Sequence, residues 1–151
     1  MTIENIKTTL YKLEKLMHGF NYEVCLGIEI FEGCSDIDNF KICLKKTYPG
    51  IDLGVSPIAI SIVDFWEEIN FGLTYRGDKR LAVELVVKNQ EAFESLEKEY
   101  KNFLTSQIKP NVKIYSYPDH TAIPGYPVWW DYRFIIQSEN SYIFIYGSAS
   151  D

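Results

Sequence analysis

The sequence has few of the side chains that perform chemistry, and no arrangement of them that marks an active site. Only two histidines, His18 and His120, occur in 151 residues, whereas nucleophilic catalysis needs a nucleophile, a base and an orienting group. Glycine-rich phosphate loops and the paired histidines of a zinc protease are absent from the sequence. We therefore expect no catalytic residues, no metal ligands and no cofactor.

Cysteine is scarce, and long apolar runs are missing. The three cysteines, Cys25, Cys34 and Cys43, form no CxxC pair, which argues against a zinc site or a disulfide framework. No apolar stretch approaches the roughly 18 residues of a membrane span, and the segment Met1–Lys7 is polar, unlike a secretory signal. We expect a cytoplasmic protein with reduced thiols and no membrane partner.

Negative charge is concentrated in the middle of the chain. The net charge is −6, and the segment 29–68 alone carries eight acids against three bases. Such a field repels phosphate backbones, so direct binding of nucleic acid is not expected, and it attracts basic proteins. The acids that we select as candidate partner contacts are Asp36, Asp38, Asp64, Glu67 and Glu68.

Aromatic residues make up 15 % of the chain, and ten of the 23 lie between Tyr115 and Tyr146. Aromatic side chains dominate both cores and binding hot spots. In a strand, Trp129 points to one side and Trp130 to the other, so we expect one of them in the core and one near solvent. The candidate aromatic anchors are Trp66, Tyr126, Trp129, Trp130 and Tyr132.

Hydrophobic periodicity predicts three helices. Apolar residues recur every three or four positions over 3–17 and 90–106, and a third helix begins at Ser35–Asp38 and ends at Tyr48–Gly50. The segment Ile51–Asn70 fits either an extended chain or a short helix, and its periodicity does not decide between them.

Residues with high β propensity predict the strands. These are Tyr22–Phe31, Phe71–Tyr75, Leu81–Val87, Val112–Tyr117, Trp129–Gln137 and Tyr142–Tyr146, with turns at Arg76–Lys79 and Ser138–Ser141. The last two strands form a C-terminal hairpin. We predict an α+β fold in which residues 1–151 form a single globular domain, with helices packed on one mixed or antiparallel sheet.

The predicted function is non-catalytic binding of a protein partner, with the acids steering the encounter and the aromatic rings making contact. The main alternative is a small enzyme or ligand-binding domain with a pocket under loop 118–127 that uses His120 and Asp119. A third possibility is a structural subunit that self-associates through its aromatic surface.

The chain also resembles small immunity proteins of bacterial toxin systems, such as contact-dependent inhibition. The resemblance lies in an acidic, aromatic-rich α+β domain without catalytic motifs, and in the ending Tyr142–Asp151. It implies a cytoplasmic inhibitor that covers the basic face of a cognate toxin, often a nuclease. No individual residue role carries over from it.

Overall fold

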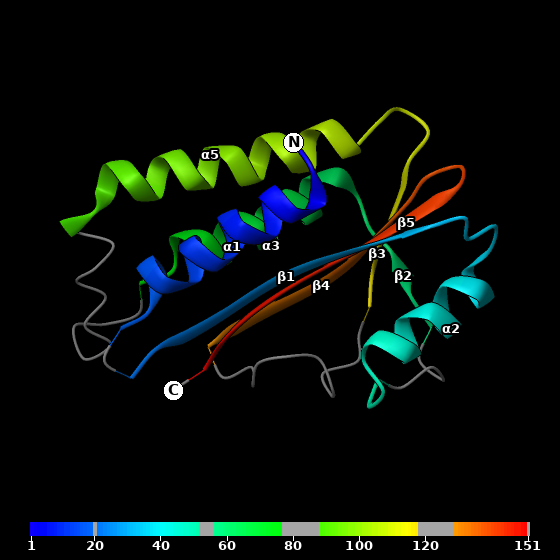
Figure 1. Ribbon diagram of the computed structural model, residues 1–151, viewed down its shortest axis with the longest axis horizontal. Helices are drawn as coiled ribbons and strands as arrows, with labels where there is room; N and C mark the ends of the chain where they lie inside the picture. Colours follow the sequence, from blue (N-terminus) through cyan, green and yellow to red (C-terminus); the bar gives the residue numbers. More distant parts are fainter. Residues whose placement is uncertain (20, 52–55, 77–87, 118–128, 151) are drawn as a thin grey trace.

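The chain folds into one antiparallel sheet with helices on both faces, as the computed structural model shows (Figure 1). The structure describes residues 1–19, 21–51, 56–76, 88–117 and 129–150. The elements in chain order are α1 (Ile3–Met17), β1 (Glu23–Glu32), α2 (Ile37–Thr47), β2 (Ile58–Ala59), α3 (Ile62–Thr74), α5 (Gln90–Gln107), β3 (Lys113–Ser116), β4 (Trp130–Gln137) and β5 (Ser141–Ser150). The strand order is β1-β5-β4-β3-β2. The predicted α+β class and C-terminal hairpin are confirmed.

Helix α1 has the predicted bounds because its apolar stripe and its N-cap agree. Ile6, Leu10 and Leu13 are buried on one side, and each contributes about 1.5–3 kcal/mol by leaving water. The hydroxyl of Thr2 accepts a hydrogen bond from the Asn5 N–H at 3.2 Å, which satisfies one of the free donors at the helix start. Helices α2 and α5 also lie where the sequence predicts them.

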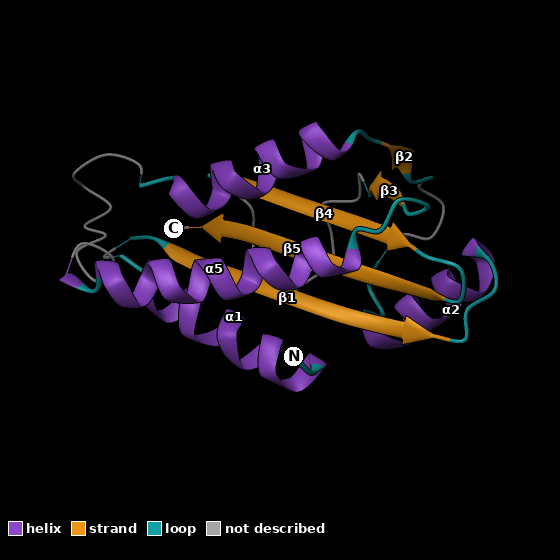
Figure 2. Cartoon of the chain, turned by 90° about the horizontal axis from the view of Figure 1, so that it is seen from above, coloured by secondary structure: helices purple, strands orange, loops and turns teal. Residues whose placement is uncertain are grey.

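The sheet separates two hydrophobic cores. Helices α1, α3 and α5 cover one face and α2 covers the other (Figures 1 and 2). Because side chains alternate along a strand, Tyr132 and Phe134 of β4 belong to the first core and Ile135 to the second. The sheet therefore separates side chains of α2 from those of α1, α3 and α5, so the two groups cannot form one continuous surface.

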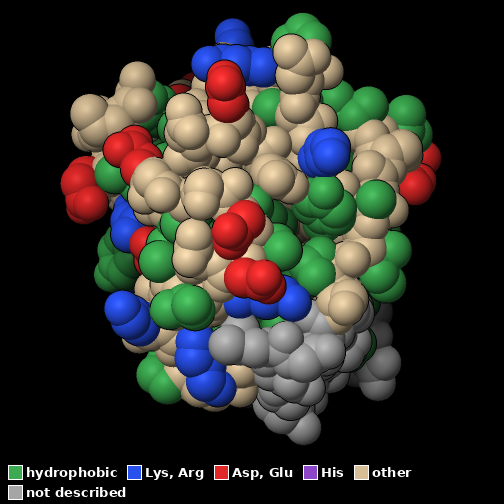
Figure 3. Space-filling model, turned by 90° about the vertical axis from the view of Figure 1, so that its right-hand side faces the viewer, with side chains coloured by type: hydrophobic (Ala, Val, Ile, Leu, Met, Phe, Trp, Pro, Cys, Tyr) green, Lys and Arg blue, Asp and Glu red, His purple; other side chains and the backbone are tan. Residues whose placement is uncertain are grey.

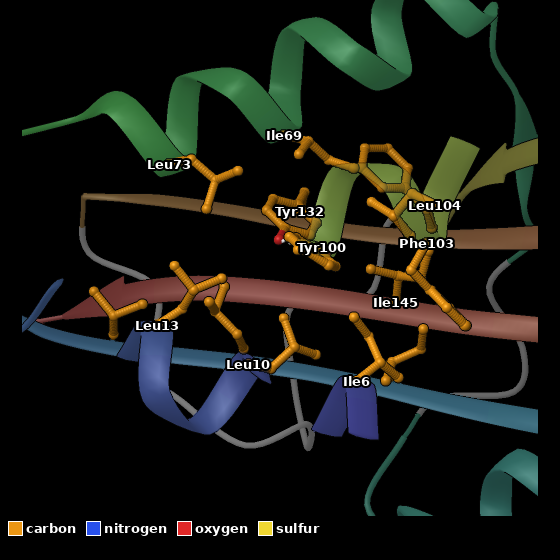
Figure 4. Packing of buried hydrophobic residues seen from close by; sticks show 14 of the residues in the cluster. Ile6, Leu10, Leu13, Ile69, Leu73, Tyr100, Phe103, Leu104, Tyr132 and Ile145 are labelled. Carbon is orange, nitrogen blue, oxygen red and sulfur yellow. Dashed lines mark hydrogen bonds between the residues drawn. The ribbon is translucent and has the colours of Figure 1, made fainter. Parts of the chain in front are cut away.

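Inside the first core, polar atoms of buried aromatic residues form hydrogen bonds with one another. The hydroxyls of Tyr100 on α5 and Tyr132 on β4 are 3.1 Å apart, and the indole N–H of Trp130 donates to the Tyr22 hydroxyl at 2.6 Å. Figure 4 shows side chains of α1, α3 and α5 converging on β4 and β5 around Tyr100 and Tyr132. These bonds fix the orientation of rings that hydrophobic burial alone would leave free to reorient.

The prediction of a strand at Phe71–Tyr75 is wrong, because these residues complete helix α3 and its C-cap. The buried stripe Phe65, Ile69 and Leu73 has helical spacing, and the Ser61 hydroxyl caps the helix by accepting from the Asp64 N–H. Burial of that stripe outweighs the β propensity of the individual residues. In the ambiguous segment Ile51–Asn70, the helical alternative is correct from Ile62 onward, whereas Ile58–Ala59 is extended as strand β2.

Strand β5 runs to Ser150, four residues beyond the predicted end at Tyr146. Its last residues pair with β1, in a register that joins Glu23 to Ser150, so the ladder holds small residues that propensity alone would not place in a strand. Strands β1 and β3 agree with the predictions within about two residues. The predicted strand Leu81–Val87 lies outside the described residues.

Within the described ranges, no helix is long and apolar enough to cross a membrane. All three cysteines carry free thiols.

The buried tyrosine pair should show strong coupling in stability. Replacing Tyr100 by Phe leaves the Tyr132 hydroxyl without its partner, and we expect a loss of about 1–3 kcal/mol in the free energy of unfolding. The double variant Y100F/Y132F removes both hydroxyls and should lose less than the sum of the two single variants. Urea denaturation measures each value, with Tyr11→Phe on the exposed side of α1 as a neutral control. Additive losses would contradict the pairing.

Candidate functional site

Helix α3 and the start of β4 together form a mixed acidic and aromatic surface. We call it the α3–β4 surface. Its members are Asp64, Glu68, Phe71, Tyr75, Trp129 and Asp131. The first four follow one another at spacings of 4, 3 and 4 residues, so they occupy one flank of the helix, beside its buried stripe.

Close packing of α3 on β4 positions this flank. A Cβ atom on Gly72 would lie 2.9 Å from the ring of Trp130, so only glycine allows the helix to approach the strand this closely. Phe65 packs on Phe134 with ring centroids 4.8 Å apart. Strand β3 pairs with β4 only from Phe134 onward, so the first residues of β4 lie beyond the end of that ladder.

The acidic part of the surface is crowded with like charge. Burial raises the pKa of Glu68 above its ordinary value, and the negative charges of Asp131 and Asp64 raise it further, while Arg133 opposes the rise. The Arg133 side chain is 4 % exposed and its guanidinium contacts the Asp131 carboxylate at 2.5 Å. Burial and neighbouring negative charge thus both disfavour the ionised form of Glu68, and perturbed carboxyls of this kind are common at functional sites.

The aromatic part of the surface is a run of rings that reaches solvent. Phe71 is 55 % exposed and Trp129 is 37 % exposed. The half-buried ring of Tyr75 lies between them, with centroid distances of 5.6 Å and 6.3 Å. Buried Tyr22 supports Tyr75 from within the core at 6.1 Å. Exposed rings on a rigid support are the kind of residue that anchors protein interfaces.

The structure divides the candidate acids between the two faces of the sheet. Asp64, Glu67 and Glu68 lie on the solvent side of α3, where the carboxyl of Glu68 is partly shielded from water. Asp36 and Asp38 lie at the start of α2, on the opposite face, where Asp36 accepts the Asn39 N–H at 2.8 Å as the helix N-cap. The prediction of one acidic pole from the whole segment is thus corrected, because the sheet lies between its two halves.

Other charges are also balanced locally. Glu29 forms an ion pair with Lys7 at 3.1 Å. On the end of the molecule seen in Figure 3, acidic and basic side chains are interspersed. The α3 flank is therefore the part of the acidic segment that remains as a candidate site.

The candidate aromatic residues at the start of β4 are divided between solvent and core, as the alternation of side chains along a strand requires. Trp129 reaches solvent, whereas Trp130 and Tyr132 are only 7 % and 2 % exposed and belong to the core. We therefore withdraw Trp130 and Tyr132 as partner contacts, because their rings pack beneath α3 and α5. Trp66 is half-buried and packs edge-on against Phe65 at 5.1 Å, so it offers only part of its ring.

Several predicted features fall outside the described residues. They are the anchor Tyr126 and the whole alternative site, with His120, Asp119 and loop 118–127. Among the residues that the structure describes, no group of three His, Cys, Asp or Glu side chains is arranged to hold a metal ion. Two surface hollows there, of about 540 and 630 Å³, contain neither histidine nor cysteine in their linings.

Sequence reasoning missed Phe71, Tyr75 and Asp131. Reading Phe71–Tyr75 as a strand hid the second helical stripe that places both rings in line with Glu68. A test of 64–75 for helical spacing on the exposed side would have found that stripe. Asp131 lies more than 60 residues beyond Glu68 in the sequence, and only the packing of α3 on β4 brings its charge near that residue.

No protein-family model matches the chain, and no curated protein matches it. The fold is similar to that of citrus MAF1 in two crystal structures. In space group P 31 2 1 the identity is 14 %, the TM-score is 0.61, and the match covers 95 % of this chain and 97 % of that one. In space group C 2 2 21 the identity is 16 %, the TM-score is 0.61, and the match covers 99 % of each chain. At this identity the likeness shows the shared fold alone.

The two adjacent tryptophans should respond oppositely to truncation. Trp130→Ala removes a buried ring and its hydrogen bond to Tyr22, and we expect it to cost about 3–5 kcal/mol of unfolding free energy. Trp129→Ala should cost less than about 1 kcal/mol, because its ring is partly in water. Denaturant unfolding of both variants measures the difference. A large loss for Trp129→Ala would place that residue in the core.

Neutralising Glu68 should stabilise the fold at neutral pH. Its folded-state pKa is raised above the unfolded value of 4.5, so ionisation costs stability as the pH rises through that range. Glu68→Gln removes this cost, and its advantage should vanish below pH 4.5, where the wild-type carboxyl is protonated in both states. The midpoint of thermal unfolding against pH tests this, with Glu67→Gln as the control. A destabilised E68Q at neutral pH would show that attraction to Arg133 dominates.

Proposed function

We propose that the protein is a non-catalytic protein-binding module that acts through the α3–β4 surface. The observation that carries the proposal is the combination of Asp64, Glu68 and Asp131 with exposed rings of Phe71 and Trp129. Carboxylates steer a cationic partner toward this face, and the rings supply contact area once it arrives. The same negative field disfavours a phosphate backbone as the ligand.

Within this role, we infer that the partner is a basic toxin domain and that the chain is an immunity protein. Such a protein acts in the bacterial cytoplasm by covering the cationic active-site face of the toxin. The support is the acidic and aromatic character of the surface, together with the burial and like charge that disfavour the ionised form of Glu68. Groups kept at a cost to stability are typical of binding sites.

A direct test uses the C-terminal domain of the protein encoded immediately upstream as the binding probe. We expect a 1:1 complex by calorimetry, and co-expression of the chain should protect cells from that domain. Absence of binding at low salt together with absence of protection would reject the immunity role.

Steering by the acids predicts an association rate that depends on salt and on the carboxylates of α3, but not on those of α2. We expect the association rate to fall about tenfold or more between low and high salt, because screening removes the long-range attraction. The variant D64N/E68Q should associate more slowly, whereas D36N/D38N removes the same charge from α2 and should not. Asparagine at 36 still caps that helix. Equal slowing by both variants would contradict the α3–β4 surface, and stopped-flow fluorescence measures each rate.

Contact by the rings predicts a loss of affinity without loss of fold. Phe71→Ala and Trp129→Ala should each weaken binding by about 2 kcal/mol or more, which is the range of hot-spot residues. Val63→Ala replaces an apolar side chain that is 61 % exposed and lies outside the surface, so it serves as the control. Titration calorimetry at moderate salt measures the affinities, and unchanged values for both ring variants would reject these anchors.

A further inference from the structure

The sheet has one long edge strand and one short one. Strand β2 spans two residues, whereas β1 spans ten residues and, within the described part of the chain, pairs with β5 on one side only. An edge strand presents a row of N–H and C=O groups that can pair with another chain, and natural proteins usually block such rows. The open side of β1 is therefore the place to look for a blocking device.

Two side chains of α1 supply that device. The Leu26 N–H donates to the Glu14 carboxylate at 2.6 Å, and the Val24 N–H donates to Nδ1 of His18 at 3.3 Å. These donors are two residues apart, so they point to the same side of β1, away from β5. Figure 2 shows α1 running along this open side.

We propose that the open edge of β1 is a pairing site for β1 of a second copy of this chain, and that Glu14 and His18 hold it closed. Both side chains occupy the acceptor positions that an incoming strand would fill with backbone carbonyls. The hydrogen bond from the Val24 N–H requires an unprotonated Nδ1, and burial lowers the pKa of His18, which favours that form.

The sequence of β1 is self-complementary in the register that uses the two capped N–H groups. Antiparallel pairing about Cys25 sets Val24 opposite Leu26 of the second copy, and Glu23 opposite Gly27. Apolar residues then meet apolar residues, and no like charges lie directly opposite each other. The two Cys25 residues face each other as a non-hydrogen-bonded pair, with Cα atoms about 4.5 Å apart.

A groove of about 210 Å³ runs between α1 and β1, beside the hydrogen bond from the Leu26 N–H to Glu14. Its lining includes Lys7, Tyr11 and Glu14 of α1 and Ile28 of β1. Ile28 continues the row of Val24 and Leu26, two residues further along, so its N–H also points to this side. A second strand would extend from the capped positions into this groove.

The test compares a double variant that removes both acceptor side chains with one that keeps an acceptor at each position. E14A/H18A removes both acceptors, whereas E14Q/H18N retains an amide oxygen at each position. We expect light scattering after size exclusion to give a dimer mass for E14A/H18A, and a monomer mass for E14Q/H18N and the wild type. A short bismaleimide should cross-link the E14A/H18A dimer, and adding Cys25→Ala should abolish the cross-link.

Several results would overturn the proposal. These are a monomeric E14A/H18A at the same concentration, equal dimerisation of both double variants, a wild-type dimer that cross-links through Cys25, or a cross-link that survives Cys25→Ala. If E14A/H18A does not fold, the single variants provide the test by amide hydrogen exchange. Glu14→Ala should speed exchange at Leu26, and His18→Ala at Val24, each by about tenfold or more relative to the matched amide variant. Unchanged exchange at both positions would reject the cap.

Discussion

The row of aromatic rings along β4 is the constraint on which the rest of the structure depends. Trp130, Tyr132 and Phe134 stack along one face of the strand, with neighbouring centroids 5.8 Å and 5.4 Å apart. Each ring also fixes a different part of the chain. Trp130 forms a hydrogen bond with Tyr22, just before β1, and Tyr132 forms one with Tyr100 of α5. Phe134 packs on α3 through Phe65. Large, oriented rings leave little freedom in how these helices cover the sheet.

This packing also determines which residues are left for binding. Since Gly72 brings α3 against Trp130, the next flank of the helix is held beside the start of β4, where the charge of Asp131 acts on Glu68. The α3–β4 surface is therefore built on elements that the core makes rigid, and a rigid anchor loses little conformational freedom when a partner binds. The same packing places the acids of α2 on the other side of the sheet, where they cannot contribute to one footprint.

Sequence patterns predicted those parts of the fold whose signal is local. Helices α1 and α5 follow from the spacing of their own apolar residues, and the opposite fates of Trp129 and Trp130 follow from alternation in a strand. The C-terminal half of α3 was missed because Phe71 and Tyr75 favour strands individually, while the evidence for a helix lies in burial of Ile69 and its neighbours. Only part of the candidate site was predictable, since Asp131 comes near enough to act on Glu68 only through packing that no local window contains.

Among the described residues, the strands at the margins of the sheet differ in how they are protected. Strand β2 is too short to template a partner strand, and β1 has two of its outward N–H groups occupied by Glu14 and His18. The start of β4 is instead flanked by α3, which places carboxylates and rings beside it. An edge whose amides are held by side chains is protected against another chain, whereas exposed rings beside carboxylates suit the contact proposed above. Strand β5 lies between β1 and β4, so the capped edge and the proposed contact surface are separate parts of the sheet.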